Sequence, residues 1–320
     1  MSGGTELLQE DVYNFLGHEI GIQSNSRGVL EYLRFIYNRF YFRCDKIFLD
    51  PLREQGKTQR LIVRIIDHLN SSNELLINDS YHLYRLLKKD GSYHIRGQNL
   101  RTLAYDTEGY CDPPTIIQSA LLQTISFLTK DYHLFHAGAV SWDDGGIIFP
   151  ASPRMGKTTL VVKLVSLGFK FLSDEVACLD SNRGVLEPFP RKINIRYESQ
   201  SLLGLKLVSN NKPHFMETKE WESTVDIDEI APATIARSCP IRYILFLRGF
   251  DEKPSLEYIP TSKSLLELFN FSISPVDDRA SMLFKFAPLM NRIQSFNLVV
   301  GNLNETSDLI KRLFDGKIPD

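Results

Sequence analysis

The sequence predicts a mixed α/β protein of two domains, and three observations lead to this prediction. The chain has 320 residues, enough for two domains or for one large domain with an elaborated N-terminal half, since single cores stop growing at roughly 250–300 residues. Hydrophobic residues make up 43% and charged residues 24% of the chain, as in an ordinary globular protein. Between residues 135 and 175, strand-like segments alternate with a segment of helical periodicity. We expect a smaller α+β domain over residues 1–112 and an α/β domain over residues 113–320.

Residues 1–112 carry strand and helix signals but no motif to which we assign chemistry. Apolar residues at helical spacing predict helices at 27–42 and at 81–89, the second of them highly charged and followed by the turn residues Asp90 and Gly91. Short apolar runs predict strands at residues 18–24, 61–66 and 74–77.

The domain boundary is placed at Pro113 and Pro114, because proline suits the first turn of a helix, here expected over residues 115–130. A strand at 135–142, a tight turn at 143–146 and a returning strand at 146–149 then predict a hairpin. The elements expected after it are a helix at 158–167 that stops at Gly168, strands at 169–172, 241–247 and 296–300, and helices at 262–269 and 281–290.

The hairpin leads into a segment that resembles a Walker A phosphate loop. Backbone N–H groups of such a loop point at phosphate oxygens, a lysine neutralises the phosphates, and the next hydroxyl binds Mg²⁺. Ala151 replaces the first glycine of the motif, and Pro153 lacks an N–H group. A short string of this kind also begins ordinary helices, but the strand before it and the helix after it favour nucleotide binding. The predicted nucleotide-binding residues are Ser152, Pro153, Arg154, Met155, Gly156, Lys157, Thr158 and Thr159.

Two carboxylates follow the next predicted strand, at Asp174 and Glu175. They are either a solvated strand end or a catalytic pair that binds Mg²⁺ and accepts a proton. We expect Asp174 to be the base, and Glu175 either to support the reacting residues from behind or to lie on the metal side with Thr158. His136, in the predicted strand before the loop, is either a core residue or a neighbour of Asp174 that tunes proton transfer.

Bulk charge and targeting signals exclude several classes of protein. With 37 basic and 39 acidic residues the net charge is −2, so the composition favours neither nucleic acid nor anionic lipid as a partner. No secretory signal and no apolar run of about 18 residues is visible, which favours a cytoplasmic protein with no membrane association. The cysteines lack metal-site or disulfide spacing and are expected as free thiols at Cys44, Cys111, Cys178 and Cys239.

The spaced motifs together resemble the HPr kinase/phosphorylase family, and more closely its relatives that act as peptide or protein serine kinases in bacterial gene clusters. The resemblance covers residues 134–196 and rests on the His-Ala-Gly-Ala-Val strand, the loop, Phe-Leu-Ser-Asp-Glu and Pro-Phe-Pro-Arg. It implies a phosphoenolpyruvate-carboxykinase-like P-loop fold. It also implies catalytic roles for Asp174, His136 and Lys157, with Arg191 and Arg196 as candidates to hold phosphate or acceptor. The family's second signature is not found, so phosphorylase activity is not expected.

The resemblance implies an ATP- and Mg²⁺-dependent kinase that phosphorylates a serine-type hydroxyl on a peptide or protein. From their position in the chain alone, residues 1–112 are a candidate for acceptor recognition. Assembly into a homo-oligomer is also implied. Two alternatives stay open from the residues: a nucleotide-binding sensor or scaffold without turnover, and a kinase for a small hydroxylated metabolite.

Overall fold

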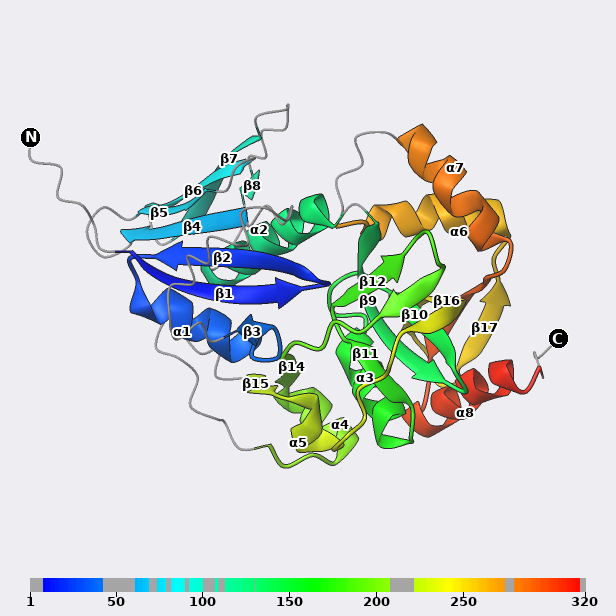
Figure 1. The fold of residues 1–320 in the computed structure, drawn as a ribbon. Helices are drawn as coiled ribbons and strands as arrows, with labels where there is room; N and C mark the ends of the chain where they lie inside the picture. Colours follow the sequence, from blue (N-terminus) through cyan, green and yellow to red (C-terminus); the bar gives the residue numbers. More distant parts are fainter. Residues whose placement is uncertain are drawn as a thin grey trace, which may run out of the picture. The chain divides into compact units, whose positions relative to one another are not determined.

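A computed structural model gives a mixed α/β protein with mostly antiparallel sheets and eight α-helices among its described residues (Figure 1). The chain divides into two compact units, residues 1–129 with 211–218 and residues 130–210 with 219–320. The predicted boundary lies one helix earlier, because α2 (Pro113–Leu128) packs on strand β5 of the first unit. The described residues are 8–42, 61–68, 74–78, 82–89, 92–99, 107–108, 113–129, 131–207, 222–273 and 279–316.

The first unit is a sheet in the order β3–β1–β2–β4–β5–β6–β7–β8, in which only the described pair β2–β4 is parallel. Helix α1 (Arg27–Ile36) begins at Ser26, whose side chain accepts a hydrogen bond from the N–H of Val29. It buries an apolar stripe that includes Leu30 and Leu33. The strands are β1 (Gln9–Phe15), β2 (His18–Ser24), β3 (Tyr41–Phe42), β4 (Leu61–His68), β5 (Glu74–Asn78), β6 (His82–Lys89), β7 (Ser92–Asn99) and β8 (Thr107–Glu108).

Two helix predictions in this unit are wrong. The helix expected to reach residue 42 ends at Ile36, because Tyr41 and Phe42 pair with β1 instead. The helix expected at 81–89 is strand β6, which is hydrogen-bonded to β5 on one side and to β7 on the other. Pairing with two neighbours outweighs the helical preference of its leucines and lysines. The predicted turn residues Asp90 and Gly91 lie outside the described residues, as do Cys44 and Cys111.

The second unit is built on two sheets that share β9 (Tyr132–Trp142) and β16 (Cys239–Phe250). One has the order β11–β9–β10–β16–β18–β17, and the other β9–β12–β13–β16. The remaining strands are β10 (Gly145–Pro150), β11 (Lys170–Ser173), β12 (Val176–Asp180), β13 (Val185–Glu187), β17 (Ser255–Tyr258) and β18 (Gln294–Val300), and a separate pair is formed by β14 (Ile193–Arg196) and β15 (Glu222–Val225).

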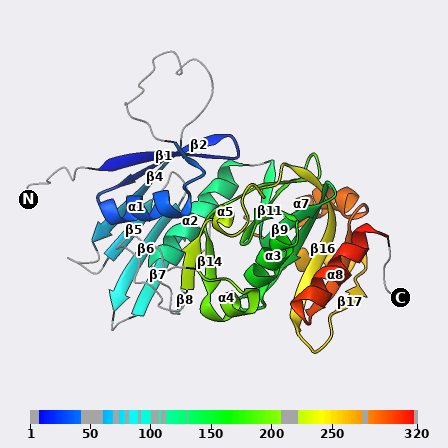
Figure 2. The ribbon, with the colours of Figure 1, turned by 90° about the horizontal axis from the view of Figure 1, so that it is seen from below.

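Two hydrophobic cores lie on opposite faces of this unit's larger sheet, because successive strand residues point to opposite sides. Ile147 belongs to one core and Ile148 to the other. The first core is closed by helices α3 (Lys157–Ser166) and α8 (Leu303–Phe314), which lie side by side in Figure 2. The second is closed by α6 (Thr261–Leu268) and α7 (Arg279–Met290). Shorter helices are α4 (Tyr197–Leu203) and α5 (Ile227–Ile230).

The predicted hairpin before the loop is confirmed. Strands β9 and β10 pair antiparallel around Asp143 and Asp144, whose φ angles of 45° and 56° are those of a two-residue type I′ turn. The predicted helix after the loop is also confirmed as α3, and Gly168, with φ of 99°, follows its end. Both elements are local in the sequence, which is why their patterns sufficed.

Gly138 allows helix α3 to approach strand β9 closely. A Cβ atom at this position would lie 2.7 Å from Cγ2 of Val161 and 3.1 Å from Cγ of Lys157. Glycine therefore sets the distance at which Lys157 rests on the strand that carries His136.

Two further sequence predictions concern the cysteines and membrane-spanning segments. Cys178 and Cys239 are buried free thiols, as predicted, and burial raises the pKa of Cys239 to about 11. In the part of the chain that the structure describes, no helix is long and apolar enough to cross a membrane.

Candidate functional site

A pocket of about 850 Å³ opens over the start of α3 in the second unit. This volume is in the range of small-molecule sites in proteins. Most of the residues predicted from the sequence to bind nucleotide or metal line it, whereas Met155 and Asp174 do not. Those that do are His136, Ser152, Pro153, Arg154, Gly156, Lys157, Thr158, Thr159 and Glu175.

The loop 151–156 connects β10 to the start of α3. Arg154 and Gly156 have positive φ angles, 70° and 78°, so the chain turns sharply twice before the helix. Helix α3 begins at Gly156 without a side-chain cap. The N–H groups of its first turn therefore have no partner within the helix, and they face the pocket with the positive end of the helix dipole.

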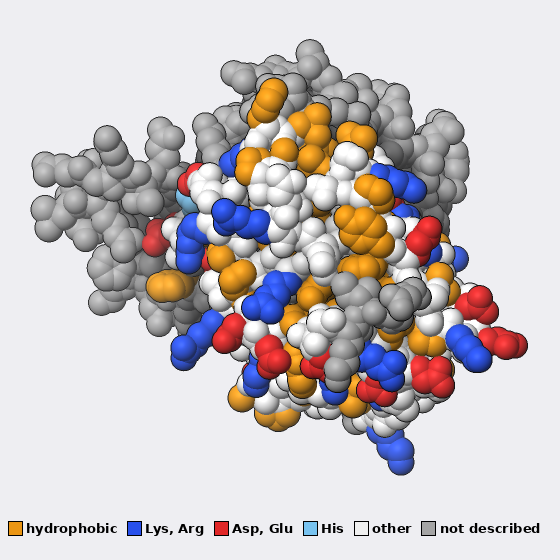
Figure 3. Space-filling model, turned by 90° about the vertical axis from the view of Figure 1, so that its right-hand side faces the viewer, with side chains coloured by type: hydrophobic (Ala, Val, Ile, Leu, Met, Phe, Trp, Pro, Cys, Tyr) orange, Lys and Arg blue, Asp and Glu red, His pale blue; other side chains and the backbone are white. Residues whose placement is uncertain are grey.

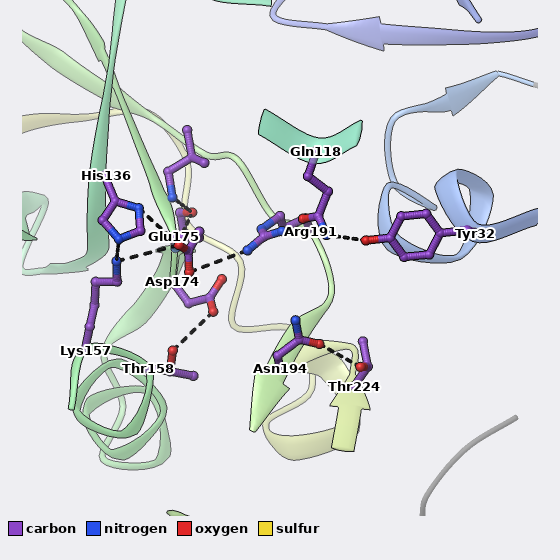
Figure 4. Close-up of polar contacts among 12 residues, drawn as sticks. Tyr32, Gln118, His136, Lys157, Thr158, Asp174, Glu175, Arg191, Asn194 and Thr224 are labelled. Carbon is purple, nitrogen blue, oxygen red and sulfur yellow. Dashed lines mark hydrogen bonds and ion pairs between the residues drawn. The ribbon is translucent and has the colours of Figure 1, made fainter. Parts of the chain in front are cut away.

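Lys157 is held in a network of charged side chains (Figure 4). Its Nζ lies 2.8 Å from Nε2 of His136 and 3.9 Å from Oε1 of Glu175, and Nδ1 of His136 lies 3.0 Å from the same carboxylate. Arg191 adds a contact of 3.5 Å from Nη2 to Oε2 of Glu175. Because an ammonium group can only donate, Nε2 of His136 accepts and Nδ1 donates to Glu175. Glu175 thus orients three cationic or donor groups.

Burial and charge set the ionisation of this network. Burial lowers the pKa of Lys157, although the carboxylates of Glu175 and Asp174 partly offset that effect. Burial opposes ionisation of Glu175, but the hydrogen bond from His136 and the charges of Lys157 and Arg191 outweigh it and hold its pKa well below the ordinary value. Glu175 is therefore the permanently charged member of the pair.

Asp174 lies apart from this network, against the start of α3. Its side chain is 2% exposed, and its Oδ2 accepts a hydrogen bond of 3.4 Å from Oγ1 of Thr158. Among the described residues, its Oδ1 has no hydrogen-bond partner. Burial raises the pKa of Asp174 to about 6; Arg191 and Lys157 lower it, and the neighbouring Glu175 raises it. A buried carboxylate with an unsatisfied oxygen is costly to a fold, which makes Asp174 a candidate functional residue.

The two carboxylates have partners other than those expected from the sequence. His136 was expected to approach Asp174, but its ring pairs with Glu175. For Glu175, one expected position was the metal side with Thr158, but the carboxylate beside Thr158 belongs to Asp174. Both residues sit in a bend between β11 and β12 rather than within a strand, so strand alternation does not decide where they point.

Thr158 and Asp174 are the residues that could hold a magnesium ion, through Oγ1 and Oδ2, which lie 3.4 Å apart. The hydroxyl of Thr158 and the carboxylate of Asp174, with its unpaired Oδ1, are the two oxygen ligands that a protein adds when phosphates and water supply the others. Within the described residues, no group of three or more His, Cys, Asp and Glu forms a metal cage.

The far wall of the pocket was not predicted from the sequence, apart from Arg196. It comes from β14 and α4 on one side and from the ends of β16 and β18 on the other. Oγ1 of Thr159 donates a hydrogen bond of 2.8 Å to Oγ of Ser199, which ties α4 to α3. Arg191, the other predicted phosphate-binding arginine, is buried on Glu175 instead. The additional lining residues are Lys163, Asn194, Ile195, Glu198, Ser199, Leu202, Phe250, Val300, Gly301, Asn302, Leu303 and Asn304.

Basic side chains outnumber acidic ones in the lining of the pocket, although the whole chain has a net charge of −2. Four basic side chains line it, those of Arg154, Lys157, Lys163 and Arg196, against the two carboxylates Glu175 and Glu198. On the face drawn in Figure 3, by contrast, basic and acidic side chains of the described residues intermingle. Attraction of an anion is thus a local property of this pocket.

The raised pKa of Asp174 predicts a pH-dependent cost to stability. The folded state holds the Asp174 proton up to about pH 6, and the unfolded chain releases it near 3.8. Stability from this group is thus full below pH 3.8 and is lost as pH rises through 6. Relative to wild type, Asp174→Asn should gain about 2 kcal/mol of unfolding free energy between pH 4 and pH 7, as measured by urea unfolding. A difference that stays constant with pH would contradict the raised pKa.

No protein-family model matches the chain, and no curated protein sequence matches it.

Proposed function

We propose that the second unit is an ATP- and Mg²⁺-dependent kinase that transfers the γ-phosphoryl group to a serine-type hydroxyl on a peptide or protein. The observation that carries this proposal is the placement of Lys157, Thr158 and the unsatisfied carboxylate of Asp174 around an uncapped helix start. Phosphoryl transfer needs little covalent chemistry from a protein, but it needs positioned charge and a proton acceptor. These three residues supply both.

Each residue then has a defined task. The N–H groups of loop 151–156 and of the first turn of α3 bind phosphate oxygens, and Lys157 neutralises their charge. When bound, Mg²⁺ would offset phosphate charge beside Thr158 and Asp174. Asp174 accepts the hydroxyl proton through Oδ1, the oxygen that its hydrogen bond with Thr158 leaves unpaired. Glu175 and His136 hold Lys157 in place.

The fold supports the same assignment. The strand that enters the loop belongs to a hairpin, and two sheets share β9 and β16, unlike a succession of βαβ units. This arrangement is the one expected of a phosphoenolpyruvate-carboxykinase-like P-loop protein related to HPr kinase. Acceptor recognition by the first unit and assembly into a homo-oligomer stay predictions.

A nucleotide sensor without turnover is the second candidate, and it is favoured by the loop itself. Ala151 is fully buried where the motif has glycine, and Pro153 removes one donor from the cradle. Such a loop can bind phosphate yet hold the γ-phosphoryl group less firmly.

Incubation with ATP labelled in the γ-phosphoryl group separates the two candidates. Wild-type protein, Mg²⁺ and proteins of the native host should yield a labelled serine-containing peptide, identified by mass spectrometry. A small labelled metabolite in the same mixture would redirect the proposal to metabolite kinases. ATP binding with neither labelled product nor ADP release would establish the sensor.

A further inference from the structure

Strand order in the second unit places different chemistry on the two sides of loop 151–156. Strands β10, β11, β16 and β18 all run parallel, since β10 and β11 are each antiparallel to β9, and β16 is parallel to both β10 and β18. Their carboxyl ends therefore meet at one edge of the sheet. Along that edge, Asp174 follows β11 on one side of the loop, and Phe250 ends β16 on the other.

Strand β16 extends past the end of β10 and brings Phe250 over the loop. Ile244 lies opposite Ile148, and β16 continues for six residues beyond it (250 − 244), whereas β10 continues for two (150 − 148). The ring of Phe250 reaches Gly156, where a Cβ atom would lie 3.1 Å from its Cε1 and Cζ. The glycine thus lets an aromatic ring rest on the loop.

Phe250 is an aromatic side chain in the pocket wall that the fold leaves uncovered. It is 64% exposed, although rings of this size gain by burial. Val300 pairs with it on β18, and the pocket wall continues through Asn302 and Leu303. The Asn302 side chain caps α8 through its oxygen, which leaves its amide NH₂ as a donor. A flat apolar surface thus lies beside amide groups.

We propose that Phe250 is a stacking platform for a nucleobase and that the pocket wall from Val300 to Leu303 completes the base site. The inference rests on the proposed function. A nucleotide whose γ-phosphoryl group faces Asp174 has its base at the opposite end, and the strand order puts Phe250 there. The amides favour a heteroaromatic ring with polar edges over an aliphatic side chain of the acceptor.

Calorimetric titration with ATP and with inorganic tripolyphosphate, both with Mg²⁺, tests this site. Tripolyphosphate carries the phosphate chain without a base. Phe250→Ala should bind ATP about 10- to 100-fold more weakly than wild type and tripolyphosphate with unchanged affinity, because only the stacking contact is lost. Phe250→Trp should retain ATP affinity. Phe284→Ala is the matched control, since Phe284 is an exposed phenylalanine of α7 that is not among the residues lining the pocket.

The outcomes distinguish this inference from the proposal beneath it. Unchanged ATP affinity in Phe250→Ala, or equal losses for both ligands, would overturn the base site, the second because Phe250 would then only support the loop. Equal affinity of the wild type for ATP and tripolyphosphate would overturn it too, while leaving the phosphate loop intact. Failure of the wild type to bind either ligand would remove the phosphate loop and the base site together.

Discussion

Replacement of Asp174 by Asn is expected to lower the rate of phosphoryl transfer by about 10²–10⁴-fold. The amide keeps the shape of the side chain and a hydrogen-bond acceptor for Thr158, but it cannot take up the proton of an acceptor hydroxyl. ATP affinity should stay within about tenfold of wild type, since phosphate binding depends on Lys157 and backbone N–H groups. ADP release with water as acceptor, together with calorimetry, measures both quantities.

Asp308→Asn is the matched control, because Asp308 is an exposed aspartate of α8 that does not line the pocket. It should behave as wild type. Undiminished turnover in Asp174→Asn would remove Asp174 from the role of base. Together with the pH-dependent gain in stability expected of the same variant, a loss of turnover would show that the buried carboxylate is retained for chemistry at a cost to the fold.

The loop and its flanking elements could be predicted from the sequence because every signal there is local. The turn at Asp143 and Asp144, the start of α3 at Gly156 and its end before Gly168 each depend on residues within a few positions. The same holds for strand β9, which was expected at nearly its observed place. Together these elements located the pocket.

Partners that depend on distant strands could not be predicted. Phe250 lies 94 positions after Gly156 in the sequence (250 − 156). Only the pairing of β10 with β16 brings the two residues together. Strand β6 was predicted as a helix because the periodicity of its own residues carries no information about β5 and β7, the two strands with which it pairs. Local pattern thus identified the loop and the start of α3, and tertiary pairing supplied the rest of the pocket.

The bend at Asp174 and Glu175 shows a third limit. Both carboxylates were identified, but their partners were exchanged, because one peptide unit turns them toward different helices and strands. Glu175 reaches β9 through His136, and Asp174 reaches α3 through Thr158. Burial raises the pKa of Asp174, whereas the hydrogen bond from His136 and the charges of Lys157 and Arg191 outweigh burial and lower the pKa of Glu175, so the two adjacent acids ionise differently.

Replacement of Lys157 by Ala is expected to abolish stabilisation by ATP. At ATP concentrations 100-fold above the dissociation constant, a bound nucleotide stabilises the wild-type fold by about 2.7 kcal/mol, which raises Tm by about 5–10 °C in a domain of this size. Lys157 is the buried cation of the loop, held 2.8 Å from His136, so its removal takes away the charge closest to the phosphates. Thermal unfolding with and without ATP and Mg²⁺ measures the effect.

The comparison uses the shift caused by ATP and not Tm itself, because removal of a buried ammonium group also changes the stability of the unliganded fold. Lys170→Ala serves as control, since Lys170 is an exposed lysine at the start of β11 that does not line the pocket. It should keep the full ATP-induced shift. If Lys157→Ala kept it too, nucleotide would bind elsewhere, and the network of His136, Glu175 and Arg191 around Lys157 would be a structural cluster and not a phosphate site.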